Sequence, residues 1–392
     1  SKGISIFLVP KHRVNPDGSL GEPNDVECTG IEHKMGIKGS ATCTLYFGEN
    51  GKCVGELLGS ERQGLPIMFI MMNEERLNVG LQAQGIGSAA YLYALKFARE
   101  RMQGQALTAG KGATDQVAII EHPDVRRMLI WMKSYVEGLR ALMYYTGDCI
   151  DRERAATDEE EKRRWTVLAE LLTPICKAYG SDMAYDVCEQ AIQVHGGYGF
   201  CSEYPVEQFA RDCKIASIYE GTNGIQAMDL IGRKLALNGG MLYMNFLNDL
   251  NAFVEANESD EKLGKYVEAL ASAKDSLAGV TDVFMTKSMS GDTLFPISYA
   301  MPYLNSFSEV VCAWLLLEQS LIAQKKLDEI CGEKGVNDPE GLKALAGEND
   351  EAKFYAGKLD SMKFYVTQIL PNVQARAASA KSEDRTILDA VL

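Results

Sequence analysis

The hydrophobic spacing of the chain changes at Gly64, and this change most limits the folds that the chain can adopt. From Leu65 to Met102 apolar residues recur at helical intervals and share one broad face. That face comprises Leu77, Leu81, Ile86, Ala90, Leu92, Leu95 and Phe97. Similar spacing predicts further helices over residues 117–154, 158–195 and 222–237. A mainly α-helical protein is therefore expected.

Residues 1–61 lack this helical spacing and read as a small β domain. Compact apolar runs at 4–9, 43–47 and 54–58 predict short strands. The sequence Asn15-Pro-Asp-Gly, which lies between the first two runs, predicts a turn. We therefore expect strands up to residue 61 and helices after it.

The composition shifts again after Asn238-Gly-Gly, and the remaining residues read as a second set of amphipathic helices. The expected helices cover 241–257, 260–288, 297–331 and 349–380, with polar loops near 290 and over 332–340. Short loops between such helices favour an antiparallel bundle. The 392 residues are thus expected to form three domains, over 1–61, 62–237 and 238–392.

Charge and cysteine usage exclude several classes of function. The formal net charge is −14, and no basic stripe offsets it, so nucleic acid is not expected as a partner. The ten cysteines are scattered without a C-x-x-C pair, and the four histidines are far apart in sequence. We therefore expect reduced thiols, no metal site and a cytoplasmic protein. The longest apolar run, 65–72, is far shorter than the ~20 residues of a membrane span.

The stretch Gly85-Ile-Gly-Ser-Ala-Ala matches the G-x-G-x-x-A pattern of dinucleotide-binding turns. That pattern requires a strand before the glycines, and here the glycines lie inside a helical run. Close packing of two helices is the expected role of these small residues.

A candidate site lies in the segment from Gln193 to Gln226. Glycines at 196, 197 and 199 end a predicted helix, and exposed amides at such a turn can approach a pyrophosphate. Farther on, Glu220 precedes a helix for which Thr222 is the expected N-cap. Two interpretations stay open from the residues alone. Glu220 is either a base held in a pocket or a charge that favours the dipole of the next helix.

Three motifs together resemble the acyl-CoA dehydrogenase family. The first comprises Q-V-H-G-G-Y-G-F, E-Y-P-V-E-Q, R-D and I-Y-E-G-T-N-G-I-Q, all within residues 193–226. The second is K-M-G-I-K-G-S at 34–40, followed by E-R at 75–76. The third, Arg101-Met-Gln-Gly, is similar to the family's R-x-Q-F-G flavin motif without its Phe. The motifs follow the order of the family over residues 1–236.

The stretch I-I-E-H-P-D-V-R-R-M-L and the extra C-terminal helices resemble the branch that includes 3-methylmercaptopropionyl-CoA dehydrogenases. The resemblance implies that 1–61 is the remainder of a middle β domain. Residues 62–237 would be the helical flavin and acyl-CoA domain, a four-helix bundle, and 238–392 an additional bundle. The family's N-terminal helical domain and its T-E-P…G-S-D flavin loop have no counterpart in the sequence. We therefore expect residues 1–392 alone to bind FAD weakly or not at all and to show no dehydrogenase activity.

The activity that this resemblance implies is the FAD-dependent α,β-dehydrogenation of an acyl-CoA thioester to the trans-2-enoyl-CoA. Glu220 would abstract the α-proton, and FAD would take the β-hydride. Tyr219 and Gly221 would flank the thioester. Asn73 and Arg76 would face the CoA moiety, although an ion pair on the helix surface is the alternative for Arg76.

The resemblance also implies a set of cofactor contacts and partners. Arg101 and Gln103 would contact the FAD of a neighbouring subunit. The adenine-diphosphate part would lie on Gln193, Gly196 and Gly197, and the flavin side on Thr222, Asn223 and Gly224. A homodimer or a dimer of dimers is therefore expected. An electron-transfer flavoprotein would accept the electrons, as in fatty acid β-oxidation.

Two alternative functions can be distinguished from a dehydrogenase by measurements in solution. A flavin acyl-CoA oxidase would release peroxide during turnover. A non-catalytic helical interaction module would lack the flavin absorbance of the purified full-length protein.

Overall fold

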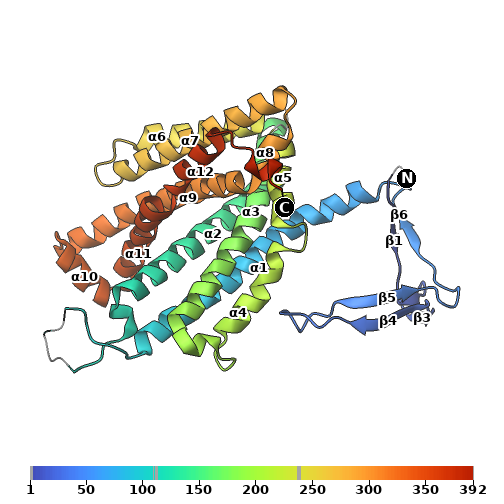
Figure 1. Ribbon diagram of the computed structural model, residues 1–392, viewed down its shortest axis with the longest axis horizontal. Helices are drawn as coiled ribbons and strands as arrows, with labels where there is room; N and C mark the ends of the chain where they lie inside the picture. Colours follow the sequence, from blue (N-terminus) through green and yellow to red (C-terminus); the bar gives the residue numbers. More distant parts are fainter. Residues whose placement is uncertain (1–2, 109, 111–113, 236–239, 392) are drawn as a thin grey trace. The chain divides into compact units, whose positions relative to one another are not determined.

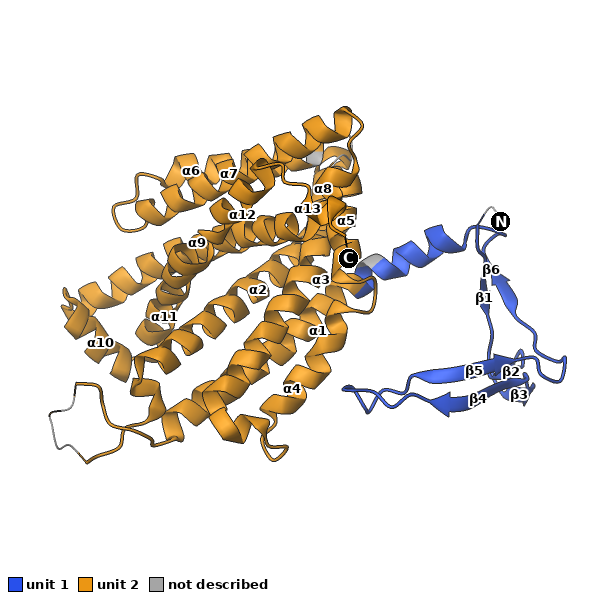
Figure 2. Ribbon diagram, viewed as in Figure 1, with its two compact units in different colours: residues 1–75 blue, residues 76–392 orange. Residues whose placement is uncertain are grey.

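The computed structural model describes residues 3–108, 110, 114–235 and 240–391, apart from the side chains of Asn73 and Leu242. Within these ranges the chain forms two compact units, residues 1–75 and 76–392 (Figure 2). The first unit holds the short strands and the beginning of the helix Gly64–Glu100, and the second is helical (Figure 1 and Figure 2). The expected fold class, mainly α with a small β part, is confirmed. The predicted boundaries at 61 and 237 stay predictions.

The strands of the first unit pair two by two in antiparallel fashion within the described residues. The pairs are β1 (Ile6–Leu8) with β6 (Glu56–Leu58), β2 (His12–Val14) with β3 (Leu20–Pro23), and β4 (Val26–Ile31) with β5 (Cys43–Phe47). The turn predicted at Asn15 forms, because the amide of Gly18 donates to the Asn15 carbonyl at 2.9 Å. Strands β2, β3 and β4 were not predicted. Their pairings contain register shifts, which weaken the alternation by which a strand is recognised.

Three long helices begin the helical part: α1 (Gly64–Glu100), α2 (Pro123–Ala155) and α3 (Glu159–His195). Helix α2 starts at a proline, which suits the first helical turn. Helix α3 is capped by the side chain of Asp158, which accepts from the amide of Glu160 at 3.2 Å. Helices α1 and α3 pass close together, since a Cβ added at Gly80 would lie 2.5 Å from the Cys176 carbonyl oxygen.

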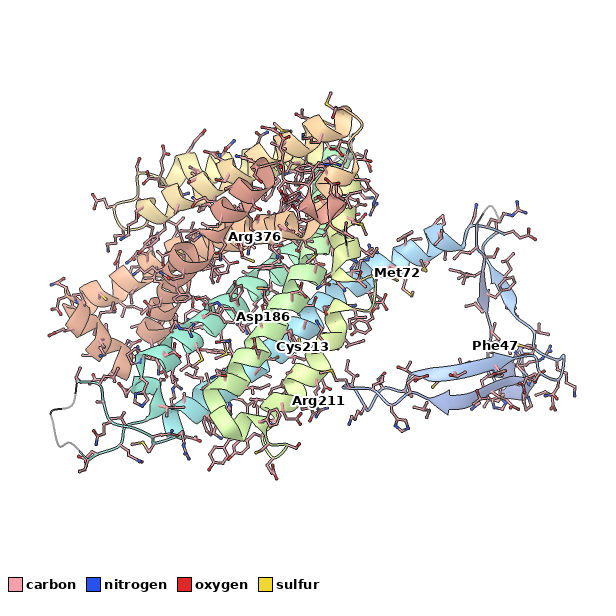
Figure 3. The ribbon with its side chains drawn as sticks, in the orientation of Figure 1. Phe47, Met72, Asp186, Arg211, Cys213 and Arg376 are labelled. Atoms are coloured by element: carbon pink, nitrogen blue, oxygen red, sulfur yellow. The ribbon has the colours of Figure 1, made fainter. Side chains whose placement is uncertain are left out.

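Short elements follow α3 and carry the candidate site. They are η2 (Gly196–Phe200), α4 (Val206–Cys213), η3 (Lys214–Ser217), α5 (Asn223–Asp229) and the π-helical η4 (Leu230–Lys234). Helix α4, which was not predicted, packs against α3, and Asp186 and Cys213 mark the two elements in Figure 3. The helix predicted over 222–237 is α5 continued by η4. Its last two residues lie outside the described ranges.

The C-terminal part is a set of packed helices, as expected. They are α6 (Met241–Asn257), α7 (Gly264–Met289), α8 (Leu294–Ser298), α9 (Ala300–Lys334), α10 (Pro339–Glu348), α11 (Asp350–Phe364), π-helical η6 (Tyr365–Ile369), α12 (Asn372–Lys381) and α13 (Thr386–Asp389). The helix predicted over 349–380 is wrong as one element. It is divided by η6 and by Pro371, which has no amide hydrogen to donate.

Helix α9 lies at the centre of the C-terminal part and packs against α2, α3, α5, α7, α11 and α12. It is long and apolar enough to cross a membrane, but 78% of its most apolar window is buried inside the protein. Polar contacts also join the two sets of helices. Glu309 of α9, which is 1% exposed, pairs with Arg376 of α12 at 2.6 Å, and the hydroxyls of Tyr179 and Tyr365 are 2.9 Å apart. The C-terminal helices therefore share one core with α2 and α3.

Candidate functional site

Glu220 lies on a tight turn between η3 and α5. Its φ is 58°, and the φ of Gly221 is 85°, so two successive residues adopt left-handed backbone conformations. Such a conformation costs a residue with a side chain about 1–2 kcal/mol. At the second position a Cβ would lie 2.8 Å from Nε2 of Gln226, so that position requires glycine. Strain held in this way at an acidic residue is typical of functional sites.

Neighbouring side chains hold this turn in place. The side-chain amide of Gln226, which is fully buried, donates to the carbonyl oxygens of Glu220 and Gly221, each at 3.4 Å. The hydroxyl of Tyr219 donates to Oε1 of Gln82 on α1 at 2.5 Å. The turn is therefore attached both to α5 and to α1.

Asn223 anchors the start of α5 on α3. Its Nδ2 donates to Oδ1 of Asp182 at 2.7 Å and to the carbonyl oxygen of Ala178 at 3.1 Å. Its Oδ1 accepts from Nζ of Lys177 at 2.9 Å. The side chain of Asn223 is thus engaged with α3, so a contact of this residue with a cofactor would use its backbone.

Two cations lie near the Glu220 turn. Lys177 is fully buried, and burial lowers its pKa to about 8, while Asp182 and Glu220 oppose that shift and Arg76 reinforces it. Arg76 is 7% exposed, its Nη1 lies 3.8 Å from Oδ2 of Asp229, and its Nη2 lies 3.7 Å from the position of a Cβ on residue 221. Arg76 is therefore buried and close to the turn, rather than part of an ion pair on the helix surface.

A second group of predicted residues gathers at the C-terminal end of α3. The guanidinium carbon of Arg101 lies 5.2 Å from the centre of the Tyr198 ring, and its Nη2 donates to Oε1 of Gln103 at 3.3 Å. A ring nitrogen of His122 lies 2.7 Å from the Gln103 carbonyl oxygen, which orders this loop. Gln193 is exposed on the last turn of α3.

The glycines of this second group suit the approach of a bulky ligand. Gly196 and Gly197 are exposed, and no described atom lies within 4 Å of a Cβ added at either position. Gly199 differs, because a Cβ there would lie 2.4 Å from the Ile192 carbonyl oxygen. The first two glycines therefore leave their backbone open, and the third has a packing role.

The predicted site residues thus form two groups, which lie at different positions along α3. Asn223 contacts α3 at Ser181, whereas the second group begins near His195. These positions are 14 residues apart, which is about 21 Å along a helix. Thr222 occupies the predicted N-cap position, is exposed and makes no side-chain capping bond with a described residue, and Gly224 follows it in α5. The side chain of Asn73 lies outside the described residues.

Sequence reasoning missed three polar residues that build the first group, namely Lys177, Asp182 and Gln226. Each lies within a helix, and the sequence pattern there marks only a helical position. The roles of Lys177 and Asp182 depend on the docking of α5 onto α3, which joins residues more than 40 positions apart. Gln226 bonds the carbonyl oxygens of Glu220 and Gly221, which precede it in the same segment.

Two protein-family models match the helical parts of the chain. Residues 62–236 match the model described as acyl-CoA dehydrogenase, C-terminal domain. Residues 246–390 match the model described as acetyl-CoA dehydrogenase C-terminal like.

Similar proteins match over nearly the whole chain. A butyryl-CoA dehydrogenase of Syntrophomonas wolfei subsp. wolfei is 40% identical over 99% of this chain. A 3-methylmercaptopropionyl-CoA dehydrogenase of Ruegeria pomeroyi is 32% identical over 100% of it. The chain spans 61% and 62% of the lengths of these two relatives.

A solved structure shares the fold. The crystal structure of an acyl-CoA dehydrogenase from Bacillus anthracis complexed with FAD superposes with a TM-score of 0.64 at 21% identity. The match covers 92% of this chain and 64% of the other.

Proposed function

This chain belongs to the acyl-CoA dehydrogenase family, and we propose that the full-length protein uses FAD to oxidise an acyl-CoA thioester between its α- and β-carbons. The names of the two relatives support an acyl-CoA substrate, and the FAD bound by the Bacillus anthracis protein supports the cofactor. The product would be the trans-2-enoyl-CoA.

The geometry of Glu220 carries this proposal. The α-proton of a thioester is a weak acid, so its removal needs a carboxylate held at a fixed position. The strained turn, its attachment by Gln226 and its two neighbouring cations supply such a position. The α-proton passes to a carboxylate oxygen of Glu220, Tyr219 forms a wall of the pocket, and Gly221 leaves room for the thioester. FAD, when bound, accepts the hydride from the β-carbon.

The residues at the end of α3 fit the adenine-diphosphate part of FAD. Gly196 and Gly197 leave backbone open to a ligand, while Arg101 supplies a positive charge and Gln103 an exposed amide. Along α3, ~21 Å of helix separates the Asn223 contact at Ser181 from His195, which agrees with one chain serving two flavins in a dimer. We therefore propose a homodimer or a dimer of dimers. If light scattering found the flavin-loaded, active protein to be a monomer, this assembly would be contradicted.

We also propose an electron acceptor and a cellular location for the protein. An electron-transfer flavoprotein would take the electrons, within fatty acid β-oxidation. A cytoplasmic location is supported by the ten cysteines, which all lie in the described ranges and are free thiols.

The test is Glu220→Gln in the full-length protein. The variant should keep FAD and acyl-CoA binding and lose about 10²- to 10⁴-fold in turnover, because a general base is removed. Glu203→Gln is the matched control, since Glu203 is an exposed glutamate of the preceding loop and should keep normal turnover. Near-normal bleaching of the flavin by substrate in Glu220→Gln would refute the assignment of the base. Peroxide release at the rate of turnover would favour an oxidase instead.

A further inference from the structure

Lys177 is buried in a place where a lysine needs an explanation. Its side chain lies in the middle of α3 with 0% of its surface exposed, and its ammonium donates to Oδ1 of Asn223 at 2.9 Å. Burying an ammonium group is unfavourable unless charges and hydrogen bonds compensate it. Lys234, which is 2% exposed, has a direct carboxylate partner, since Oε2 of Glu170 lies 3.0 Å from its Nζ. Lys177 instead holds a neutral amide.

That amide belongs to the residue that begins α5. Asn223 follows Glu220 by three residues, and its Nδ2 also donates to Asp182, one turn farther along α3 than Lys177. These bonds, with those to Ala178 and Ser181, clamp the start of α5 against α3. A movement of this residue would pass through three peptide units to Glu220. Gln226, which bonds the carbonyl oxygens of the turn, would move with the same helix.

The charges around Lys177 come from three elements. Asp182 of α3 and Glu220 of the turn attract its ammonium, and Arg76 of α1 repels it. Burial is the larger influence and lowers the pKa of Lys177 to about 8. The ammonium and the carboxylate of Glu220 thus attract each other.

We propose that Lys177 is the positioning residue of Glu220: its ammonium holds Asn223, which fixes the turn, and its charge attracts the Glu220 carboxylate. The role of Glu220 as a base rests on the proposed function. The positioning of the turn rests on the contacts alone.

The test compares Lys177→Met with Lys234→Met in the full-length, FAD-loaded protein. Methionine is an unbranched side chain only one atom shorter than lysine, and it removes the charge and the donor. Hydrogen exchange of the amides of residues 219–226 should become about tenfold faster in Lys177→Met, because a hydrogen bond from a charged group is lost. Lys234→Met also loses a buried lysine but should leave exchange over 219–226 unchanged. Equal exchange at these amides in Lys177→Met and the wild type would overturn the proposal.

The pH dependence of turnover separates positioning from a general loss of structure. In Lys177→Met, kcat should fall about 10- to 100-fold with KM within about twofold, because the base is misplaced and substrate binding is kept. The wild-type kcat should decline above pH ~8 as the ammonium loses its proton, and Lys177→Arg, which stays charged, should not show this decline. A wild-type decline that persists in Lys177→Arg would count against the charge of Lys177 as its cause and overturn that part of the proposal.

If Lys177→Met does not fold, Asn223→Ala removes the acceptor of the same hydrogen bond. This variant should show the same faster hydrogen exchange at the amides of residues 219–226. Unchanged exchange in Asn223→Ala would refute the positioning. Normal turnover in Glu220→Gln, by contrast, would refute the assigned base and leave the faster exchange in Lys177→Met as support for the clamp itself.

Discussion

Gly80 provides a quantitative test of how closely α1 and α3 pack. In Gly80→Ala the new Cβ would lie 2.5 Å from the carbonyl oxygen of Cys176 and 2.9 Å from Cε of Met143. Ordinary contacts of a Cβ begin near 3.4 Å, so the two helices would have to separate by about 0.9 Å. The methionine end can rotate away, but the carbonyl belongs to the α3 backbone. Overpacking of this kind destabilises a core by about 1–3 kcal/mol.

Alanine also brings a gain, because it favours a helix over glycine by about 1 kcal/mol. Gly85→Ala isolates that gain, since Gly85 is exposed on the same helix and no described atom lies within 4 Å of its added Cβ. Gly180→Ala should be intermediate, because its nearest contact, at 2.8 Å, is the movable Cε of Met143. The expected net changes in the free energy of unfolding are about 0 to −2 kcal/mol for Gly80→Ala and about +1 kcal/mol for Gly85→Ala.

The assay is guanidinium unfolding of the full-length variants, followed by circular dichroism of the helices. A change in the midpoint at constant slope reports a change in stability. If Gly80→Ala proves as stable as Gly85→Ala, then α1 and α3 do not approach as closely as the structure shows.

Two further outcomes are expected. The pKa of Lys177 is lowered by burial to about 8 from an ordinary 10.5, so between these pH values the folded protein loses this proton first. The unfolding free energy of the wild type should therefore rise with pH relative to that of Lys177→Met across that window. Denaturation measured at several pH values checks this. An equal pH dependence in the two proteins would contradict the burial of Lys177. Arg376→Met should destabilise the protein by about 3–5 kcal/mol, because it leaves the buried carboxylate of Glu309 without its partner. Adding Glu309→Gln should recover most of that loss in thermal melting, and no recovery would contradict the pairing.

The long helices could be predicted closely because their spacing repeats over many turns. The range predicted as 158–195 is α3 at Glu159–His195, and the range 241–257 is α6 at Met241–Asn257. Short elements could not be predicted in the same way. Helix α4 spans 8 residues and strand β2 spans 3, so neither repeats its pattern often enough to be recognised.

In the candidate site, too, features set by neighbouring residues could be predicted, and features set by residues far apart in the sequence could not. The Glu220 turn is encoded within a few residues, because Gly221 must accept a left-handed backbone next to it. The clamp at Lys177 joins residues 46 positions apart, and it forms only once α5 has docked on α3. A lysine in a helix gives no sign in the sequence that it will be fully buried.

The burial of α9 has a consequence for the order in which the protein is made. This helix emerges from the ribosome before α11 and α12, two of the helices that cover it. Until they arrive, a segment apolar enough for a lipid bilayer is only partly shielded by α2, α3 and α7. Nascent chains in that interval expose the kind of surface that chaperones bind and that aggregates form through. A ribosome that stalls after α9 has emerged, but before α12 has, would therefore present the cell's quality-control machinery with an uncovered core helix.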